Sequence, residues 1–494
     1  MSDFFTPLER TAAFHPDKPA IRFAGRTISY GTFVARVRAI AGALKRDGVG
    51  AGDRVAVLST NHPDMLALLF AVSRVGAILV PLNWRLAPDE LAYAIGHCEP
   101  SILVHGEEFA GVACQFMPAE NLRAVGSDAL AGDEAELSAG APDAPCLLVY
   151  TSGTTGRPKG ALISNASLMG NAVQSHHMHQ MTADDHVLTV LPLFHVGGLN
   201  IQTTPALLAG ATVTLHERFD AAATLDAVVA DRPSLTVLVP ATIEALAATP
   251  GFGTADLSSL RAVATGSTIV SERVIARLTD RGVPVLCIYG ATETCPIAAY
   301  DRAGQERVPG GTGRAGLLTD LAVVDGNGRA VPTGQHGEIA VRGPIFSGYY
   351  RDEAATREAF VQGHWLSGDL GSLSPDGTLT VHERKKNMIV SGGENIYPAE
   401  IERVLSGHPA VSACAVVAKP DQRWDEVPVA FVVVSDAIDA TALVAHVGEH
   451  LARFKVPRDL RIVPELPRTA LGKIQHDVLR RAAAAPLASE PAKA

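Results

Sequence analysis

Residues 150–160 read Tyr-Thr-Ser-Gly-Thr-Thr-Gly-Arg-Pro-Lys-Gly and follow the apolar run Leu147–Val149. The two internal glycines let successive backbone N–H groups converge on an anion, four hydroxyls add donors, and Lys159 adds a positive charge. The stretch therefore predicts a phosphate-binding loop at the end of a strand. It is not the P-loop of kinases and GTPases, because Pro158 stands where that motif has its second glycine and Gly160 where it has Ser or Thr.

The composition indicates a large globular protein. The chain has 494 residues, 47% of them hydrophobic, with a formal net charge of −10; the length gives room for about three domains, and the acidic balance argues against nucleic acid as a partner. The six cysteines include no Cys-x-x-Cys pair, and the N-terminus lacks the basic and apolar segments of a signal peptide. The most hydrophobic window, Met65–Leu82, is too short and interrupted to span a membrane. We expect a soluble, cytoplasmic protein with reduced thiols.

Hydrophobic periodicity predicts an α/β fold. Apolar runs such as 55–58, 78–82, 235–239 and 285–288 predict strands, and they alternate with segments of helical spacing such as 33–44. This alternation predicts parallel sheets covered by helices on both faces. Short β-like pieces between Gly and Pro turns fill residues 337–385. A small αβ unit follows, with expected helices at 399–405 and 442–452 and expected strands at 413–417 and 429–434.

Six blocks in order carry a resemblance to a known family. After Thr151–Gly160 come Pro192–His195, Tyr289–Glu293, Gly368-Asp369, Arg384–Asn387 continued by Ser391–Glu402, and Pro467–Ile474. The series resembles the adenylate-forming superfamily of acyl-CoA synthetases, firefly luciferase and peptide-synthetase adenylation domains. The resemblance implies a large N-terminal AMP-binding domain (1–385) of parallel-sheet αβ layers with a small β-barrel-like part. It also implies a small mobile C-terminal α+β domain (386–482), followed by a disordered tail (483–494).

The resemblance implies a two-step ligation of a carboxylic acid to coenzyme A. The acid attacks the α-phosphate of ATP to give an acyl-adenylate and pyrophosphate, and the thiol of CoA then displaces AMP. Lys473 is the implied catalytic cation between carboxylate and α-phosphate, and Glu293 and Thr151 are the implied Mg²⁺ ligands. The ATP- or AMP-binding residues are implied to be Thr151, Ser152, Gly153, Thr154, Thr155, Gly156, Lys159, Gly266, Ser267, Tyr289, Gly290, Ala291, Thr292, Asp369, Arg384 and Lys473. Glu293 also suits a helix N-terminus, where a carboxylate is stabilised by the helix dipole.

The resemblance places a hinge and a CoA site in the C-terminal part. Lys386 is the implied hinge about which the small domain rotates between the half-reactions. Asn387 departs from the Asp that is usual next to it. The implied CoA-binding residues are Gly392, Gly393, Trp424, Phe454, Lys455 and Arg458, with stacking and charge holding the nucleotide. Core packing of the two aromatic side chains is an equally good interpretation.

The implied acyl pocket indicates the class of acid. Its expected lining includes His195, Val239, Gly290 and Pro296, with His195 as a catalytic, substrate-gating residue, and the stretches around them contain no Lys or Arg. A second buried substrate carboxylate would lack a partner there. We therefore expect a monocarboxylic acid, aromatic or aliphatic of medium length, rather than malonate. o-Succinylbenzoate stays open, because residues 191–195 and 289–295 also resemble its CoA ligases.

Two other enzyme functions are compatible with the same motifs. A stand-alone adenylation enzyme would load a carrier protein instead of CoA, and a luciferase-like monooxygenase would use the adenylate with oxygen. A homodimer is left open. His176, His177 and His179 predict a solvated loop rather than a metal site, because no carboxylate or Cys stands at ligand spacing.

Overall fold

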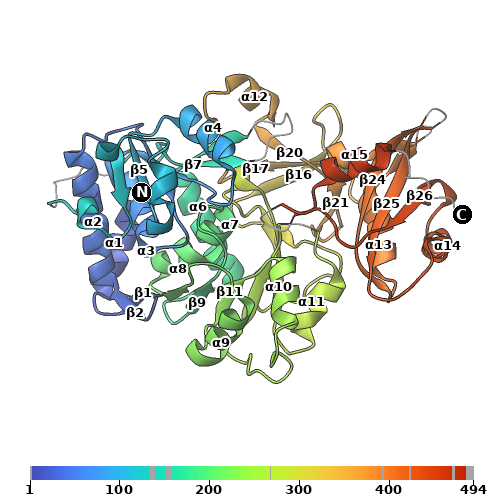
Figure 1. Cartoon of the computed structure of the whole chain (residues 1–494), viewed down its shortest axis with the longest axis horizontal. Coiled ribbons are helices and arrows are strands. Elements are labelled where there is room, and N and C mark those ends of the chain that lie inside the picture. The colour runs from blue at the N-terminus through green and yellow to red at the C-terminus, as the bar shows by residue number, and fades with distance from the viewer. Residues whose placement is uncertain are drawn as a thin grey trace, which may run out of the picture. The chain divides into compact units, whose positions relative to one another are not determined.

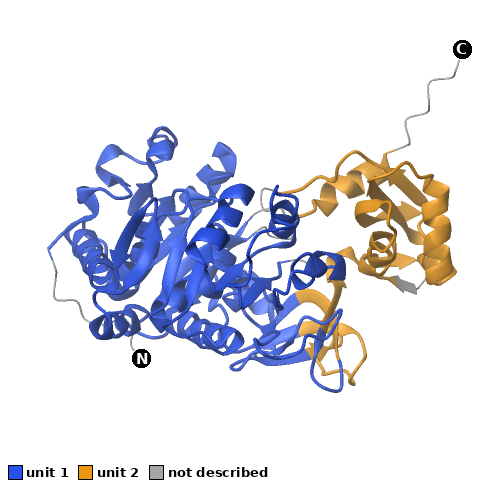
Figure 2. Cartoon of the chain, turned by 90° about the horizontal axis from the view of Figure 1, so that it is seen from below, with its two compact units in different colours: residues 1–322, 340–367, 374–379 blue, residues 323–339, 368–373, 380–494 orange. Residues whose placement is uncertain are grey.

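The computed structural model describes residues 3–133, 140–151, 158–267, 269–391, 394–421, 424–469 and 473–485. These residues form two compact units. Unit 1 consists of residues 1–322, 340–367 and 374–379, and unit 2 of residues 323–339, 368–373 and 380–494 (Figure 2). The boundary expected between residues 385 and 386 stays a prediction.

A nine-stranded sheet forms the centre of one half of unit 1, with the order β15-β14-β13-β12-β11-β9-β10-β1-β2. The strands from β13 to β1 are parallel, and antiparallel strands close both edges. The bounds are β1 Pro19–Phe23, β2 Arg26–Ser29, β9 His186–Thr189, β10 Thr212–Leu215, β11 Leu235–Val237, β12 Ala262–Thr265, β13 Val285–Tyr289, β14 Ala299–Tyr300 and β15 Arg314–Ala315.

Helices α9 (Ala221–Asp231), α10 (Pro240–Ala247) and α11 (Glu272–Thr279) cover one face of this sheet (Figure 1). Their apolar stripes meet strand residues in a single buried cluster that includes Val228, Leu246, Leu278 and Val263. The central strands β10, β11, β12 and β13 are buried on both faces, which explains their continuous apolar runs. Helices α1 (Phe5–Phe14), α2 (Tyr30–Arg46), α6 (Asn165–His179) and α8 (Thr204–Ala209) also belong to this unit.

A second, seven-stranded sheet of unit 1 has the order β18-β8-β7-β4-β3-β5-β6. The strands from β7 to β6 are parallel, whereas β8 and β18 are antiparallel additions. Helix α3 (Pro63–Val75) is buried along almost its whole length, as expected for a helix that is apolar all round. The other bounds are β3 Arg54–Leu58, β4 Ile78–Pro81, β5 Ile102–His105, β6 Leu122–Ala124, β7 Pro145–Thr151, β8 Lys159–Ser164, β18 Gly348–Tyr349, α4 Pro88–Cys98 and α5 Ala110–Ala113.

The region of short β-like pieces forms a five-stranded sheet in the order β16-β17-β20-β19, with β21 paired to β20. The division between the two units runs through these strands. Their bounds are β16 Asp320–Val324, β17 Gly337–Arg342, β19 Phe360–Val361, β20 His364–Leu373 and β21 Leu379–Arg384; α12 spans Glu353–Glu358.

The rest of unit 2 is an α+β layer around a sheet with the order β23-β22-β25-β24, with β26 paired to β25. Side chains alternate between the faces of β24, as strand geometry requires: Val416 joins a cluster with α13 and α14, and Val417 a cluster with α15. The bounds are α13 Pro398–Ser406, α14 Ala440–His450, α15 His476–Ala484, β22 Ile389–Ser391, β23 Glu394–Ile396, β24 Val411–Asp421, β25 Asp425–Val434 and β26 Asp459–Ile462. The predicted fold class is confirmed.

The expectation of a solvated loop at His176, His177 and His179 is wrong. All three lie in the last turns of α6, and His179 is fully buried. The rings find acceptors inside the fold, since His176 Nε2 donates to the carbonyl of Pro205 and His179 Nδ1 to that of Ser175. Burial lowers the pKa of His179 to about 4, so this imidazole is neutral. Within the described residues, no helix is both long enough and apolar enough to cross a membrane.

Candidate active site

Several predicted site residues follow the carboxyl ends of neighbouring parallel strands in unit 1. His195 comes after β9, Val239 after β11, Gly266 after β12, and Gly290 after β13. These four strands are adjacent and parallel, so their carboxyl ends share one edge of the sheet. Ligands of open α/β sheets bind outside this edge. The structure thus gathers the expected acyl-pocket and adenine residues on one side of unit 1.

Gly266 and Gly290 lie so close to neighbouring backbone atoms that neither position has room for a side chain. A Cβ on Gly290 would lie 1.7 Å from the carbonyl oxygen of Pro296, and a Cβ on Gly266 would lie 2.5 Å from that of Ile288. Gly290 and Pro296, both expected in the acyl pocket, are therefore direct neighbours. Ser267, which follows Gly266, has a φ of +76°, a conformation that costs energy for a residue with a side chain.

Glu293 lies in a short helical turn, η5 (Thr292–Thr294), that begins three residues after β13 ends. The hydroxyl of Thr294 fixes the start of this turn by accepting a hydrogen bond from the backbone N–H of Ala291, at 2.9 Å. Glu293 is only 8% exposed, and its side chain accepts a hydrogen bond from the hydroxyl of Tyr349, at 2.9 Å. A buried carboxylate held in one direction suits a divalent cation.

Thr151 and Lys159 face each other across the β7–β8 pair. Two residues after Lys159 in β8, Ala161 pairs with Tyr349 of β18. The ammonium of Lys159 lies 5.1 Å from the centre of the Tyr349 ring. Since Tyr349 also holds Glu293, the structure brings Lys159 and Glu293 together around one tyrosine, and Thr151 lies opposite Lys159 in the neighbouring strand. The hydroxyl of Thr151 and the carboxylate of Glu293 are oxygen donors of the kind that Mg²⁺ prefers. Ser152, Gly153, Thr154, Thr155 and Gly156 lie outside the described residues.

Sequence reasoning missed Tyr349. Burial, with the charge of Glu293 as a second cause, raises the pKa of Tyr349 well above its ordinary value. The phenol therefore keeps its proton and donates to Glu293 at any physiological pH. A Gly-Tyr-Tyr stretch carries no local signal for this role, which follows from the pairing of β18 with β8.

His195 ends the connection after β9 and caps the short helix α7 (Val196–Gly198), where its Nδ1 accepts from the N–H of Gly197, at 3.1 Å. Buried Asn61 fixes the chain just before it. Its amide nitrogen donates to the carbonyl of Leu191, at 3.0 Å, and its oxygen accepts from the N–H of Leu193, at 2.8 Å. Asn61 is thus a positioning residue for the segment that carries His195, and it too was missed from the sequence.

In unit 2, the two residues expected at the ribose are already paired. Arg384 at the end of β21 contacts the buried carboxylate of Asp369 in β20, at 2.8 Å. The adjacent Lys385 is held by Glu338, at 2.8 Å, and Glu338 also accepts from the N–H of Gly368, at 3.0 Å. These pairs fix the strand segment that carries Asp369 and leave its carboxylate beside a guanidinium; a carboxylate so held can accept hydrogen bonds from a ribose diol.

The expected hinge residue, Lys386, lies in a single helical turn, η6 (Lys385–Asn387). Asn387 is buried and bonds on both sides: its amide nitrogen donates to Glu383, at 3.1 Å, and its oxygen accepts from Arg480 of α15, at 2.5 Å. Arg480 also donates to the backbone carbonyl of Lys386, at 3.2 Å. Hydrogen bonds from Arg480 of α15 therefore hold this turn in place.

Lys473 lies at the base of a tight loop. The N–H of Thr469 donates to the carbonyl of Lys473, at 2.7 Å, the N–H of Lys473 donates to the hydroxyl of Thr469, at 3.2 Å, and Arg468 forms a β-bridge with Ile474. These contacts join the two ends of the loop, at residues 468–469 and 473–474. Residues 470–472 lie outside the described residues.

The residues expected at CoA form two pairs in unit 2. The guanidinium of Arg458 lies 6.0 Å from the Trp424 ring centre, and the ammonium of Lys455 lies 5.8 Å from that of Phe454. Lys455 is also ion-paired with Glu400, at 2.6 Å, so its charge is partly neutralised. Arg458 beside Trp424 is the better candidate for a nucleotide. Gly392 and Gly393 lie outside the described residues.

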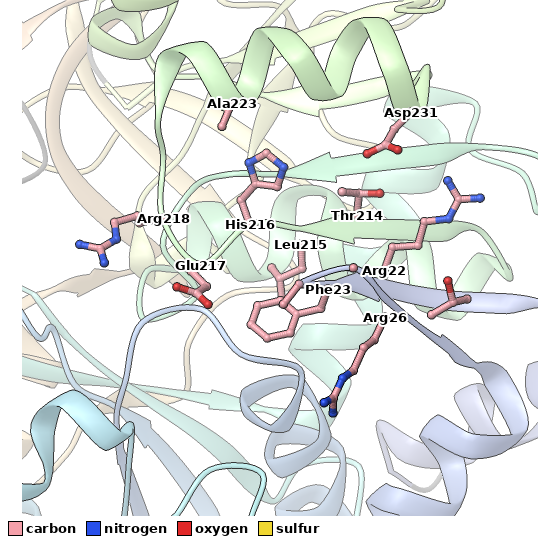
Figure 3. Close-up of a pocket in the computed structure, with 13 residues that line it drawn as sticks. Arg22, Phe23, Arg26, Thr214, Leu215, His216, Glu217, Arg218, Ala223 and Asp231 are labelled. Atoms are coloured by element: carbon pink, nitrogen blue, oxygen red, sulfur yellow. The ribbon is translucent and has the colours of Figure 1, made fainter.

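A cavity of about 590 Å³ in unit 1 contains none of the predicted site residues. It lies at the β1–β2 hairpin, and its lining includes Arg22, Arg26, Arg218, Glu217 and Asp231. The three guanidinium groups point in different directions (Figure 3), so they do not form a common anion site. The candidate active site is at the strand ends described above.

Comparisons with known proteins agree with this geometry. Residues 8–350 match the family model of the AMP-binding enzymes, and residues 400–473 match that of the AMP-binding enzyme C-terminal domain. The chain is 46% identical to an indoleacetate–CoA ligase of Aromatoleum aromaticum and 40% identical to a feruloyl-CoA synthase of an Amycolatopsis species; each alignment covers 96% of this chain and 97% of the relative.

Two solved structures are similar over the whole chain. ATP-bound MatB from Rhodopseudomonas palustris is 30% identical with a TM-score of 0.91, covering 98% of this chain and 99% of that one. The o-succinylbenzoate CoA synthetase of Bacillus subtilis, in complex with its acyl-adenylate, is 29% identical with a TM-score of 0.87, covering 99% of both chains. The family model, the relatives and the strand-end site lead to one conclusion: the chain belongs to the AMP-binding enzymes and is an acid–thiol ligase of that family.

Proposed function

We propose that this enzyme joins an aromatic monocarboxylic acid to coenzyme A through an acyl-adenylate. The observation that carries the proposal is that no Lys or Arg stands in the stretches around the expected acyl-pocket residues His195, Val239, Gly290 and Pro296. A ring fits such a surface, whereas a second carboxylate there would be buried without a partner. Relatives at 46% and 40% identity are named for indoleacetate and feruloyl substrates, both aromatic. A medium-chain aliphatic acid is the nearest alternative.

In the first half-reaction, a carboxylate oxygen of the acid attacks the α-phosphorus of ATP and the bond to the leaving pyrophosphate breaks. Two anions must approach each other, so positive charge has to lie between them. Lys473 supplies that charge. Thr151 and Glu293 would hold Mg²⁺, which neutralises phosphate charge when bound, and Lys159 adds a cation beside them. Asp369 and Arg384 bind the ribose, while Tyr289, Ala291 and Thr292 line the nucleotide.

In the second half-reaction, the thiolate of CoA attacks the acyl carbon and AMP leaves. Lys473 is no longer needed at this stage. The proposed rotation about Lys386 withdraws it and brings up Gly392 and Gly393, past which the pantetheine can reach the adenylate. Arg458 and Trp424 hold the nucleotide end of CoA by charge and stacking. His195 gates the passage between the acyl pocket and the thiol.

o-Succinylbenzoate is the second candidate, since the structure solved with the adenylate of that acid is 29% identical over 99% of both chains. It needs a cationic partner for its second carboxylate, and no Lys or Arg stands in the stretches around the expected acyl-pocket residues. The aromatic ring is common to both candidates, and the second carboxylate is the feature that separates them in this pocket.

The test is release of AMP and pyrophosphate from ATP with a panel of acids, measured with and without CoA. Indoleacetate, ferulate, benzoate, o-succinylbenzoate and octanoate span the candidates. The proposal predicts CoA-dependent AMP release that is highest for an aromatic monocarboxylate. Preference for octanoate or o-succinylbenzoate would contradict the substrate class, and pyrophosphate exchange without turnover of CoA would favour loading of a carrier protein. Light emission or oxygen uptake would indicate the luciferase-like alternative.

A further inference from the structure

We propose that His446, Glu449 and His450 form a binding site for a transition-metal dication on helix α14. The three residues occupy the last turn of the helix, in the sequence His-Val-Gly-Glu-His. Residues three and four positions apart share one face of an α-helix. One nitrogen from each imidazole and one carboxylate oxygen lie within 4.8 Å of one another.

One imidazole is already set in the tautomer that binds a metal. Nδ1 of His450 lies 2.8 Å from the backbone carbonyl of His446. A carbonyl only accepts hydrogen bonds, so Nδ1 carries the hydrogen and Nε2 presents its lone pair. Metal-bound histidines are usually oriented by such a hydrogen bond from the other ring nitrogen. The ring centres of His446 and His450 are 4.5 Å apart, close enough to turn toward one ion.

The surroundings favour a cation. The site lies at the C-terminal end of α14, where the helix dipole is negative, and Glu449 adds a formal negative charge. Glu449 and His450 are exposed, so their side chains can close the distance to the roughly 3.3 Å that separates two donors on a tetrahedral zinc ion. Two imidazoles with one carboxylate suit Zn²⁺, Ni²⁺ or Cu²⁺, whereas Mg²⁺ prefers oxygen donors alone. The ion of this site therefore differs from the Mg²⁺ expected at Glu293.

His408 provides a matched comparison. Its ring centre lies 5.0 Å from that of His446, at an interplanar angle of 78°. Its Nδ1 accepts a hydrogen bond from the N–H of Ala410, at 3.2 Å, so in the neutral ring the hydrogen is on Nε2. His408 thus packs against the site without offering it a lone pair.

The test is calorimetric titration of the full chain with Zn²⁺, after removal of any affinity tag and of bound metal with EDTA. We expect His450→Ala to weaken the binding of one zinc equivalent by about tenfold or more, since it removes a donor nitrogen, and Glu449→Gln to weaken it by less, since it removes the charge but keeps a side-chain oxygen. We expect His408→Ala to leave the affinity within about twofold and excess Mg²⁺ not to compete. Identical zinc binding by wild type and His450→Ala would overturn the proposal, as would displacement of that equivalent by Mg²⁺. Ligase activity plays no part in either readout.

Discussion

Arg480 donates a hydrogen bond to the side-chain oxygen of Asn387, at 2.5 Å, while the amide nitrogen of Asn387 donates to Glu383, at 3.1 Å. Only a group with both a donor and an acceptor can join a guanidinium to a carboxylate in this way. This explains why the chain has asparagine at position 387, where aspartate is usual in its family. The departure is part of a local network that includes the carbonyl of the expected hinge, Lys386.

Replacing Asn387 by Asp should destabilise unit 2. The new carboxylate would face Glu383, whose pKa burial already raises, and one of the two would have to stay protonated. We expect a loss of about 1–3 kcal/mol in the free energy of unfolding near neutral pH and a smaller loss in mild acid. Urea denaturation at two pH values measures this. Equal stability of variant and wild type at neutral pH would contradict the network.

Replacing Tyr349 by Phe should impair the first half-reaction alone. Without the hydroxyl, Glu293 loses the hydrogen bond that orients it, and we expect adenylate formation to slow by roughly tenfold, or about 1.4 kcal/mol, with a higher Mg²⁺ requirement. Pyrophosphate release against Mg²⁺ concentration measures both. Tyr350→Phe, one residue further on, is the control and should behave as wild type. An unchanged Mg²⁺ requirement in Tyr349→Phe would show that Tyr349 does not position a metal ligand.

Replacing Gly290 by Ala should disrupt the candidate site at the carboxyl end of strand β13. The added Cβ would lie 1.7 Å from the carbonyl of Pro296, so backbone must move, at a cost of about 1–3 kcal/mol. We expect adenylate formation to fall together with the melting temperature. Gly253→Ala is the matched control and should behave as wild type, since its added Cβ would meet nothing within 4 Å. Full activity in Gly290→Ala would mean that this close approach does not shape the site.

Glu402 makes the stability of unit 2 dependent on pH. Burial, reinforced by Glu383, raises its pKa from 4.5 to about 8. The folded chain therefore holds a proton that the unfolded chain releases, and the resulting stabilisation is complete below pH 4.5 and is lost as pH rises toward about 8.

Glu402→Gln should therefore raise the melting temperature above that of wild type by about 3 °C in alkaline buffer, with little gain near pH 4.5. The amide keeps an oxygen that can accept from the N–H of Val416, at 2.7 Å in the wild type. Thermal unfolding across the pH range is the measurement. A difference independent of pH would refute the raised pKa.

The sequence predicted those parts of the fold and site that depend on local patterns. The apolar runs at 235–239 and 285–288 marked strands β11 and β13, because parallel strands buried on both faces need continuous apolar side chains. For the site, the six ordered motifs carried a resemblance to the adenylate-forming family, and that resemblance implied the roles of Glu293, Asp369 and Lys473, which stay predictions.

The contacts that position these residues could not be predicted locally. Tyr349 reaches Glu293 across 56 residues, and Asn61 reaches Leu193 across 132. Such pairs follow from strand pairing and packing, which leave no spacing pattern in the chain. The histidines of α6 misled for a related reason: their polarity suggested solvent, while carbonyls distant in sequence, such as that of Pro205, satisfy them inside the fold.

The central claim is that Lys473 serves adenylate formation and not thioester formation. It is tested by assaying Lys473→Ala in both half-reactions, with pyrophosphate release from ATP and acid for the first, and thioester yield from CoA and a supplied acyl-adenylate for the second. We predict that pyrophosphate release falls by about a hundredfold or more and that the thioester yield stays close to that of wild type. Equal loss of both activities, or normal pyrophosphate release, would contradict the claim.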